Sequence, residues 1–295
     1  MANFQILCFV FFLLNFFSLS AQTSVFVSAH PDDWQLFMNP DAYLSVKSGE
    51  KVIFIHTTSG DGGNEGSAYY TAREQGSLRA IRFLRNVSTP GAEGLGMDMQ
   101  QKETTISGNP KEAEHYLQRY TYDNIVVYFV RLPDGGYSGE GTPVGKGNSI
   151  QKLYNGTISS ILSVDQRNKY YSSADLKETL KSIVKKESTG YITFHIADTD
   201  EATNPGDHSD HIYSAKYMED VAKELGNNKI IYHQGYCTAS KPVNVTDKNT
   251  LWINIATWGV TCSALADYKS IAGTTWQDDH NVYVDKQYTR TVTNK

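Results

Sequence analysis

Residues 25–33 have the sequence Val25-Phe26-Val27-Ser28-Ala29-His30-Pro31-Asp32-Asp33, in which an apolar run meets a polar cluster. The β-branched and aromatic residues predict a buried strand that ends at Ala29, and Pro31 favours a turn directly after it. A helix is then expected to begin at the paired aspartates and to continue to about Val46. The polar cluster would therefore lie at the carboxyl end of a strand.

A second polar cluster follows another predicted strand. Tyr191–Ile196 is the strand, and a loop rich in Asp, Thr, Asn, Pro and Gly leads from it to His208-Ser209-Asp210-His211. We expect a helix to start here and to run to about Leu225, with both histidines on one helix face. Because ligands bind at the carboxyl ends of strands in open α/β sheets, the two clusters indicate one shared site.

The residue types in these clusters suit a divalent metal. Two imidazoles and a carboxylate are ligands that zinc prefers, and a carboxylate and an imidazole remain for proton transfer. Each cluster alone has an ordinary alternative, because His-Pro-Asp-Asp also forms a capped turn and histidines at helix starts are commonly solvated. Their equivalent positions favour a zinc hydrolase. The other histidines lack metal-ligand spacing: His56, His115, His195, His233 and His280. Of these, His56 and His195 lie within predicted strands and are interpreted as core or supporting residues, and His280 lies either in a solvated acidic loop or at the pocket.

The remaining segments alternate between strand and helix patterns. Further strands are predicted at 51–57 and 125–130, and helices at 69–86 and 173–186. This order predicts an α/β fold, a Rossmann-like three-layer sandwich with a mostly parallel sheet. We expect one domain over residues 22–295, with a C-terminal extension from about residue 237 whose pattern is the least distinct. That part is predicted to hold a strand at 251–255 and a helix at 263–270.

The net charge and the N-terminal sequence indicate which partners and which cellular compartment to expect. The 295 residues carry a net charge of −5 without a basic run, which argues against nucleic acid. Residues 6–19 are apolar and precede Ser20-Ala21, so residues 1–21 are predicted to be a signal peptide cleaved near Ala21. This stretch is short of the ~20 residues that a stable membrane span needs. The mature protein would be secreted or periplasmic, where Cys237 and Cys262 either form a disulfide or remain thiols.

Over roughly residues 25–235, the chain resembles the PIG-L/LmbE-like family of zinc-dependent N-deacetylases. Four sequence elements carry the resemblance: 29–33 (AHPDD), 58–63 (TSGDGG) with Arg73-Glu74 downstream, 132–135 (LPDG) and 208–211 (HSDH). The first and last are specific in combination. Two positions depart from the family pattern, since Trp34 replaces an acidic residue and Ser209 replaces a proline. Because of these two changes, the resemblance does not determine the identity of the substrate.

The resemblance implies roles for individual residues. His30, Asp33 and His211 would bind one Zn²⁺ per chain, although another divalent metal remains possible. Asp32 would be the general base, and His208, tuned by Asp210, would stabilise or protonate the tetrahedral intermediate as a cation. Arg73 would either bind a substrate hydroxyl or phosphate, or pair with nearby glutamates. Asp134 is interpreted as an ordinary turn residue.

The sequence thus predicts a zinc-dependent N-deacetylase that acts on GlcNAc-type saccharides or glycoconjugates. Two alternatives remain open: a zinc hydrolase of another small amide, and a carbohydrate-binding protein on the same fold without turnover. Nineteen tyrosines are compatible with sugar stacking, yet they also serve as core residues. The long loop 133–148 is expected to form a lid or a substrate wall, unless it is disordered.

Overall fold

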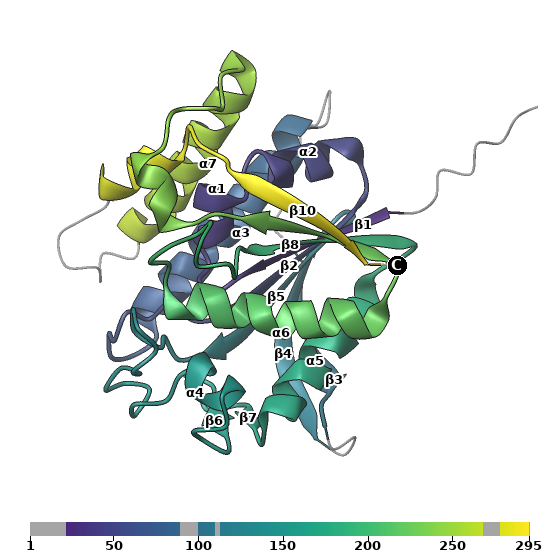
Figure 1. Cartoon of the computed structure of the whole chain (residues 1–295), viewed down its shortest axis with the longest axis vertical. Helices are drawn as coiled ribbons and strands as arrows, with labels where there is room; N and C mark the ends of the chain where they lie inside the picture. The colour runs from purple at the N-terminus through teal and green to yellow at the C-terminus, as the bar shows by residue number, and fades with distance from the viewer. Residues whose placement is uncertain (1–21, 89–99, 110–112, 268–277, 295) are drawn as a thin grey trace, which may run out of the picture.

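An eight-stranded sheet forms the centre of the protein, in the order β10-β9-β8-β1-β2-β5-β4-β3 (Figure 1). The computed structural model describes residues 22–88, 100–109, 113–267 and 278–294, so the predicted signal peptide lies outside the described residues. The strands are β1 (Gln22–Ser28), β2 (Lys51–Thr58), β3 (Gln100–Ser107), β4 (Glu114–Tyr122), β5 (Ile125–Leu132), β8 (Tyr191–Ala197), β9 (Asn228–His233) and β10 (Thr289–Asn294).

The five central strands are parallel and the two edges are antiparallel. β9, β8, β1, β2 and β5 pair in parallel, whereas β10 runs against β9, β4 against β5 and β3 against β4. The predicted mostly parallel sheet is therefore confirmed. The edge strands lacked a clear signal because a half-exposed antiparallel strand has no continuous apolar run, as the polar sequence of β3 illustrates.

Helices cover both faces of the sheet (Figure 1). α5 (Ser173–Glu187) and α6 (Ser209–Leu225) pack on one face. The other face carries α1 (Asp33–Phe37), α2 (Asp41–Ser48), α3 (Ala68–Ser88) and α7 (Lys248–Asp267). The remaining elements are α4 (Ile150–Tyr154), the small hairpin β6 (Ile161–Leu162) and β7 (Lys169–Tyr170), and the 3₁₀ helices η1 (Tyr236–Ser240) and η2 (Asp278–Tyr283). The result is the expected Rossmann-like sandwich.

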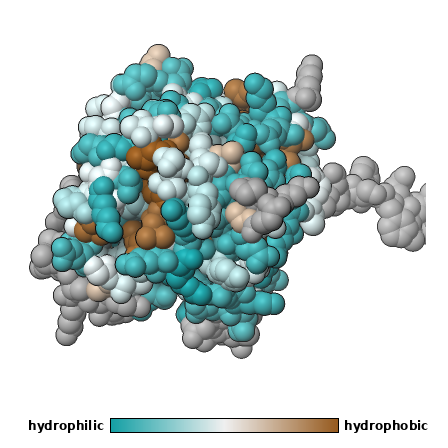
Figure 2. Space-filling model, turned by 90° about the horizontal axis from the view of Figure 1, so that it is seen from below, coloured by the Kyte–Doolittle hydropathy of each residue, from teal (hydrophilic) through white to brown (hydrophobic). Residues whose placement is uncertain are grey.

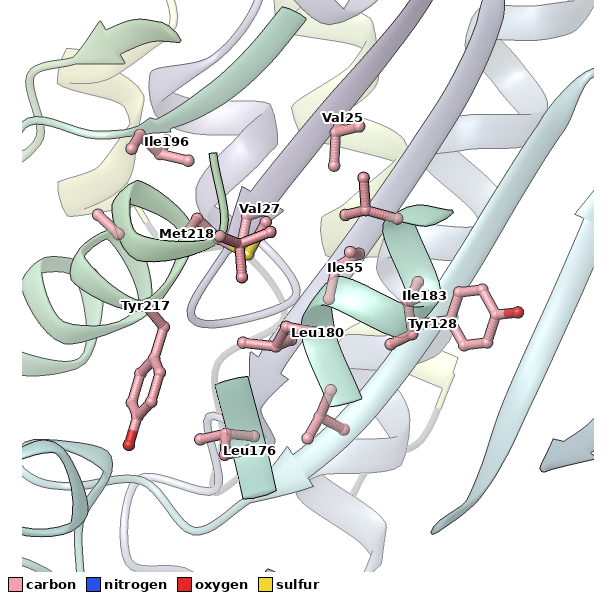
Figure 3. Close-up of a cluster of buried hydrophobic side chains, with 14 of the residues drawn as sticks. Val25, Val27, Ile55, Tyr128, Leu176, Leu180, Ile183, Ile196, Tyr217 and Met218 are labelled. Atoms are coloured by element: carbon pink, nitrogen blue, oxygen red, sulfur yellow. The ribbon is translucent and has the colours of Figure 1, made fainter. Parts of the chain in front are cut away.

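Alternate side chains of the central strands pack into two separate hydrophobic cores, one on each face of the sheet. On β1, Val25 and Val27 point toward α5 and α6, whereas Phe26 points toward α1, α2 and α3. Figure 3 shows the first core, in which Leu176, Leu180 and Ile183 of α5 meet side chains of the sheet. Burial on both faces explains why the parallel strands are apolar throughout.

Two predicted elements differ from the structure. The helix expected from Asp32 to Val46 is interrupted, because Pro40 has no N–H to donate to a helix; α1 ends at Phe37 and α2 begins at Asp41. The strand expected at 251–255 is wrong, since these residues belong to the twenty-residue helix α7, which packs on α3. A short apolar run fits either structure, and only the packing partner distinguishes them. The predicted helix 263–270 lies in α7 up to Asp267, and its remainder is outside the described residues.

The strand order reverses at β1. The chain leaves β1 toward β2 and β5, and it later returns to place β8 and β9 on the other side of β1. The crevice beyond the carboxyl ends of β1 and β8 is the point at which open α/β sheets bind ligands. Both polar clusters of the sequence follow these two strands.

The surface and the cysteines complete the description. Figure 2 shows a face on which hydrophilic residues predominate and hydrophobic ones are confined to separate patches, as is normal for a folded protein. None of the helices within the described residues combines the length and the apolar character needed to cross a bilayer. Cys237 and Cys262 do not form a disulfide with each other.

Leu180 tests the core between the sheet and α5. It is fully buried, so we expect Leu180→Ala to lower the free energy of unfolding by about 2–5 kcal/mol through lost burial and the cavity left behind. Urea denaturation measures this change. Leu44→Ala is the control, because Leu44 is exposed and its truncation should stay within about 0.5 kcal/mol of the parent protein. Equal effects of both variants would contradict the assigned core.

Candidate active site

Three side chains predicted to bind metal converge beyond β1 and β8. His30 follows β1, Asp33 is the first residue of α1, and His211 lies in the first turn of α6. His30 Nδ1 is 3.4 Å from Asp33 Oδ1 and 3.3 Å from His211 Nε2, and the last two atoms are 3.2 Å apart. All three side chains are buried. We call these residues the metal triad.

The spacing of the metal triad suits a tetrahedral cation. With metal–ligand bonds of 2.0–2.1 Å, neighbouring ligands of a tetrahedral zinc ion lie about 3.3 Å apart. The three distances between the triad atoms, 3.2 to 3.4 Å, agree with this value. One protein carboxylate and two imidazoles also leave a position for a water or substrate oxygen, as in catalytic rather than structural sites.

The charges around the triad also favour a cation. Burial lowers the pKa of His30, yet Asp33, Asp210 and Asp134 together raise it to about 10. Burial also lowers the pKa of His211, but Asp33 and Asp207 raise it by more, so the pKa of His211 lies above its usual value. The negative potential of these carboxylates thus stabilises positive charge between the ligands, which a bound divalent cation would supply instead of protons.

Asp207 fixes the orientation of His211. Its Oδ1 lies 2.8 Å from His211 Nδ1, and its carboxylate also accepts hydrogen bonds from Asn204 Nδ2 at 2.8 Å and from the His208 N–H at 2.9 Å. The proton of His211 is thereby held on Nδ1, so that Nε2 is available to a metal. Sequence reasoning missed Asp207, although a carboxylate directly before the second cluster was the available signal.

We expect Asp207→Asn to weaken zinc binding by about 10- to 100-fold without unfolding the protein, because the amide keeps the shape but removes the charge that supports His211. Zinc affinity is measured by competition with a chelator of known affinity. Asp200→Asn serves as a control, since Asp200 lies in the same loop and contacts none of the triad. Unchanged affinity in Asp207→Asn would contradict this supporting role.

Asp210 acts on His30 rather than on His208. Its Oδ2 lies 3.4 Å from His30 Nε2 and accepts the N–H of Gly135 at 2.9 Å. The expected tuning of His208 by this carboxylate is thus not seen; only the backbone N–H of Asp210 contacts His208. Gly135 is required here, since a Cβ at this position would come within 2.4 Å of Asp210 Oδ1. The carboxylate therefore supports the outer nitrogen of a triad imidazole.

Asp134 belongs to the site, against its interpretation as a turn residue. Its Oδ2 is 3.6 Å from His30 Nε2, and its Oδ1 is 4.0 Å from His208 Nε2. The N–H groups of Gly62 and Gly136 donate to the same carboxylate at 3.2 and 2.9 Å. The Leu-Pro-Asp-Gly segment thus places a second carboxylate between two active-site imidazoles.

His208 is held as a neutral imidazole. It is the N-cap of α6, and its Nδ1 accepts the Asp210 N–H at 3.1 Å, which leaves its proton on Nε2. Burial, together with the positive charges of His30 and His211, lowers the pKa of His208 to about 3. The structure therefore favours a neutral hydrogen-bond donor, in contrast to the cation expected from the sequence.

Asp32 and Arg73 form a buried ion pair. The Arg73 guanidinium donates to Asp32 Oδ1 and to the carbonyl oxygen of Gly60. Gly60 has a φ of +58°, and a Cβ there would collide with the guanidinium. The partner of Arg73 is thus an aspartate of the first cluster and not the neighbouring glutamates, of which Glu74 pairs with Arg131 instead. Arg73 positions the proposed base.

A cavity of about 720 Å³ lies behind the Asp134 segment, and no residue of the metal triad lines it. Asp61 and Pro133 are part of its wall, and Asp61 Oδ2 accepts the N–H of Asp134 at 2.9 Å. Much of the remaining wall comes from loop residues 143–148, so the long loop is ordered and forms a wall. The cavity has the volume of a typical small-molecule site.

Two tyrosine rings contact the histidines of the centre. Tyr137 contacts the His208 ring edge-on at a centroid distance of 5.7 Å, and Tyr236 lies 5.3 Å from the His211 ring. Tyr137 is 55% exposed, whereas Trp34 is fully buried in the core on the α2 side of the sheet. Tyr137 therefore offers an exposed aromatic surface beside His208, and Trp34 does not.

A buried metal triad, a paired carboxylate and a neutral imidazole at the switch point of a Rossmann-like sheet together define a metal-dependent amide hydrolase. Residues 25–222 match the family of GlcNAc-PI de-N-acetylases, PIG-L. The chain belongs to this family, and it is accordingly a metal-dependent deacetylase.

Solved structures of similar fold include other deacetylases. N,N'-diacetylchitobiose deacetylase from Pyrococcus horikoshii is 14% identical, with a TM-score of 0.45 over 92% of this chain and 76% of that chain. A deacetylase of teicoplanin biosynthesis is 10% identical, with a TM-score of 0.49 over 91% and 96% of the two chains. GalB, a 4-carboxy-2-hydroxymuconate hydratase, is 11% identical, with a TM-score of 0.38 over 89% and 82%. No curated protein sequence matches the chain. These distant similarities assign no substrate.

Proposed function

We propose that the protein is a zinc-dependent N-deacetylase that removes the acetyl group from a GlcNAc-type saccharide or glycoconjugate. The observation that carries this proposal is the tetrahedral spacing of His30, Asp33 and His211 beside Asp32 and His208. Zinc, when bound there, supplies a Lewis acid and lowers the pKa of a water to about 7. Membership in the PIG-L family supports an N-acetyl substrate.

The protein groups divide the proton transfers between them. Asp32 takes a proton from the attacking water, while Arg73 holds its carboxylate in one orientation. The Nε2–H of His208 donates a hydrogen bond to the oxygen of the acetamide as that oxygen gains negative charge. The proton on Asp32 is then available to the leaving amine, so that protons balance over the reaction.

The surroundings of the site support a saccharide. Tyr137 presents an exposed ring beside His208, and aromatic faces stack well on sugar rings. The adjoining cavity is lined by polar groups that suit hydroxyls, among them Asn64, Glu65, Ser67 and Asn148. A glycan whose acetamido group lies at the triad would have to extend past Asp134 to reach this cavity.

The test is acetate release from a panel of N-acetylated sugars, together with metal content, with and without a chelator. Chelator-sensitive release from GlcNAc-type compounds with about one catalytic metal per chain supports the proposal. Acetate release only from small non-sugar amides would show that the substrate is not a saccharide, and it would favour a hydrolase of another small amide. Binding of sugars without any release would instead favour a lectin-like role, and a chain that holds no metal would overturn the proposal.

We also propose that the protein is secreted or periplasmic. Support comes from the apolar run over residues 6–19 and from the small residues that precede Gln22, the first residue of β1. Expression of the full chain followed by N-terminal sequencing of the exported protein tests this. An exported chain that starts near residue 22 is the expected result, and retention of an uncleaved chain in the cytosol would contradict it.

A further inference from the structure

A second cluster of potential metal ligands lies on the α2 side of the sheet. It consists of Asp41, the first residue of α2, together with His195 on β8 and His233, the last residue of β9. His195 Nδ1 is 3.0 Å from His233 Nε2, and Asp41 Oδ2 is 3.7 Å from the first nitrogen and 3.9 Å from the second. No sequence motif indicates this cluster, because the three residues come from widely separated segments.

These distances leave room for a metal ion. A point within the triangle of the three atoms lies about 2.1 Å from each of them, which matches zinc–nitrogen and zinc–oxygen bonds. Two nitrogens and one oxygen form a ligand set that late first-row divalent metals accept. The set is the same as that of the metal triad, one carboxylate and two imidazoles, and no atom is shared between the two groups.

The environment holds the ligands in the form that binds metal. Burial lowers the pKa of both imidazoles, in His233 to about 3, so each is neutral at physiological pH and has a lone pair to offer. Burial also raises the pKa of Asp41 to about 6, against the lowering effects of a hydrogen bond with Gln287 and of nearby Lys229. The carboxylate is thus mostly ionised at neutral pH, and within the described residues no lysine or arginine forms an ion pair with it.

The cluster has a path to solvent. Asp41 and His195 line a cavity of about 180 Å³, whose other walls include Ser24, Glu50 and Lys229. The Asp41 side chain is 25% exposed, whereas those of His195 and His233 are almost fully buried. A metal could therefore enter through this cavity and complete its coordination with water.

We propose that Asp41, His195 and His233 form a second site for a late first-row divalent cation, such as Zn²⁺, in addition to the metal triad. His233 also lines the small cavity that contains Asp33 and His211. A metal at the second site would tie α2 to β8 and β9 and hold this wall of the active site in place. The competing description is a plain hydrogen bond between two neutral imidazoles.

Zinc stoichiometry of the full chain distinguishes the two descriptions. We expect equilibrium dialysis against Zn²⁺ to give two ions per chain for the parent protein, one for His211→Ala, one for Asp41→Asn and none for the double variant. Glu50→Gln is the matched control, because Glu50 lines the same cavity without belonging to the cluster, and it should keep two. One ion for the parent and none for His211→Ala would overturn the proposal.

A spectroscopic measurement separates loss of the site from loss of the fold. Co²⁺ bound to the His211→Ala variant should give visible d–d bands from the second site, and these bands should disappear when Asp41→Asn is added. Circular dichroism establishes whether each variant is folded. Bands that persist in the folded double variant would overturn the role of Asp41, and their absence from folded His211→Ala would overturn the site itself.

Discussion

Asp32→Asn is expected to lower kcat for deacetylation by about 10²- to 10⁴-fold while the zinc content stays unchanged. The amide oxygen can still accept the hydrogen bond from Arg73, so the local geometry is preserved, but the side chain can no longer take a proton from water. Steady-state acetate release and metal analysis on the same preparation measure the two quantities.

Asp200→Asn provides the matched control for Asp32→Asn. Asp200 is an exposed carboxylate in the loop after β8, where it accepts the N–H of Ala202, and its neutralisation should leave kcat within a few-fold of the parent value. A kcat that is retained in Asp32→Asn would exclude Asp32 as the base. A simultaneous loss of zinc would show instead that Asp32 supports the metal.

The second large effect is expected from His211→Ala, which should remove the zinc of the metal triad and reduce deacetylation to background. His211 supplies one of three protein ligands, and its loss leaves Asp33 and Asp207 without their shared imidazole. Metal analysis after dialysis and acetate release measure the outcome. Full occupancy of the triad in this variant would refute the ligand assignment.

His115→Gln controls for the removal of a buried histidine. His115 is as buried as His211 and bonds to a carboxylate, Asp175 Oδ1 at 2.9 Å, but it lies on β4 far from the triad in the sheet order. This variant should lose stability and keep its metal. Loss of metal in both variants would mean that His211→Ala acts through general unfolding.

The ligands of the proposed metal site were predictable because local rules place them. A strand that stops at His30 and a helix that starts at His208 bring the two clusters to one edge of the sheet, whatever the remaining topology. Asp134 was missed because the residues that it contacts, His30 and His208, are distant in the sequence. Asp207 was missed although it precedes His211 by four residues, because a loop aspartate before a helix has many other roles. The Asp41 cluster depends on three separate elements, so no spacing reveals it.

The parts of the fold that follow from local sequence were predictable as well. The buried parallel strands are recognisable as continuous apolar runs, as in residues 125–132. The edge strands β3 and β10 are largely exposed and depend on their neighbours for structure. Helix α7 was mistaken at 251–255 because its apolar residues contact α3, a partner that the local sequence does not specify.

His208 joins two properties that are usually separate in an enzyme. The same ring that faces the reacting centre also caps α6 by accepting the Asp210 N–H, and helix caps are worth about 0.5–2 kcal/mol. Substitution by alanine would therefore remove chemistry and helix start together, whereas asparagine would keep the cap alone. Selection for a stable fold and selection for turnover thus act on position 208 at the same time, so few other residues can replace this histidine during evolution.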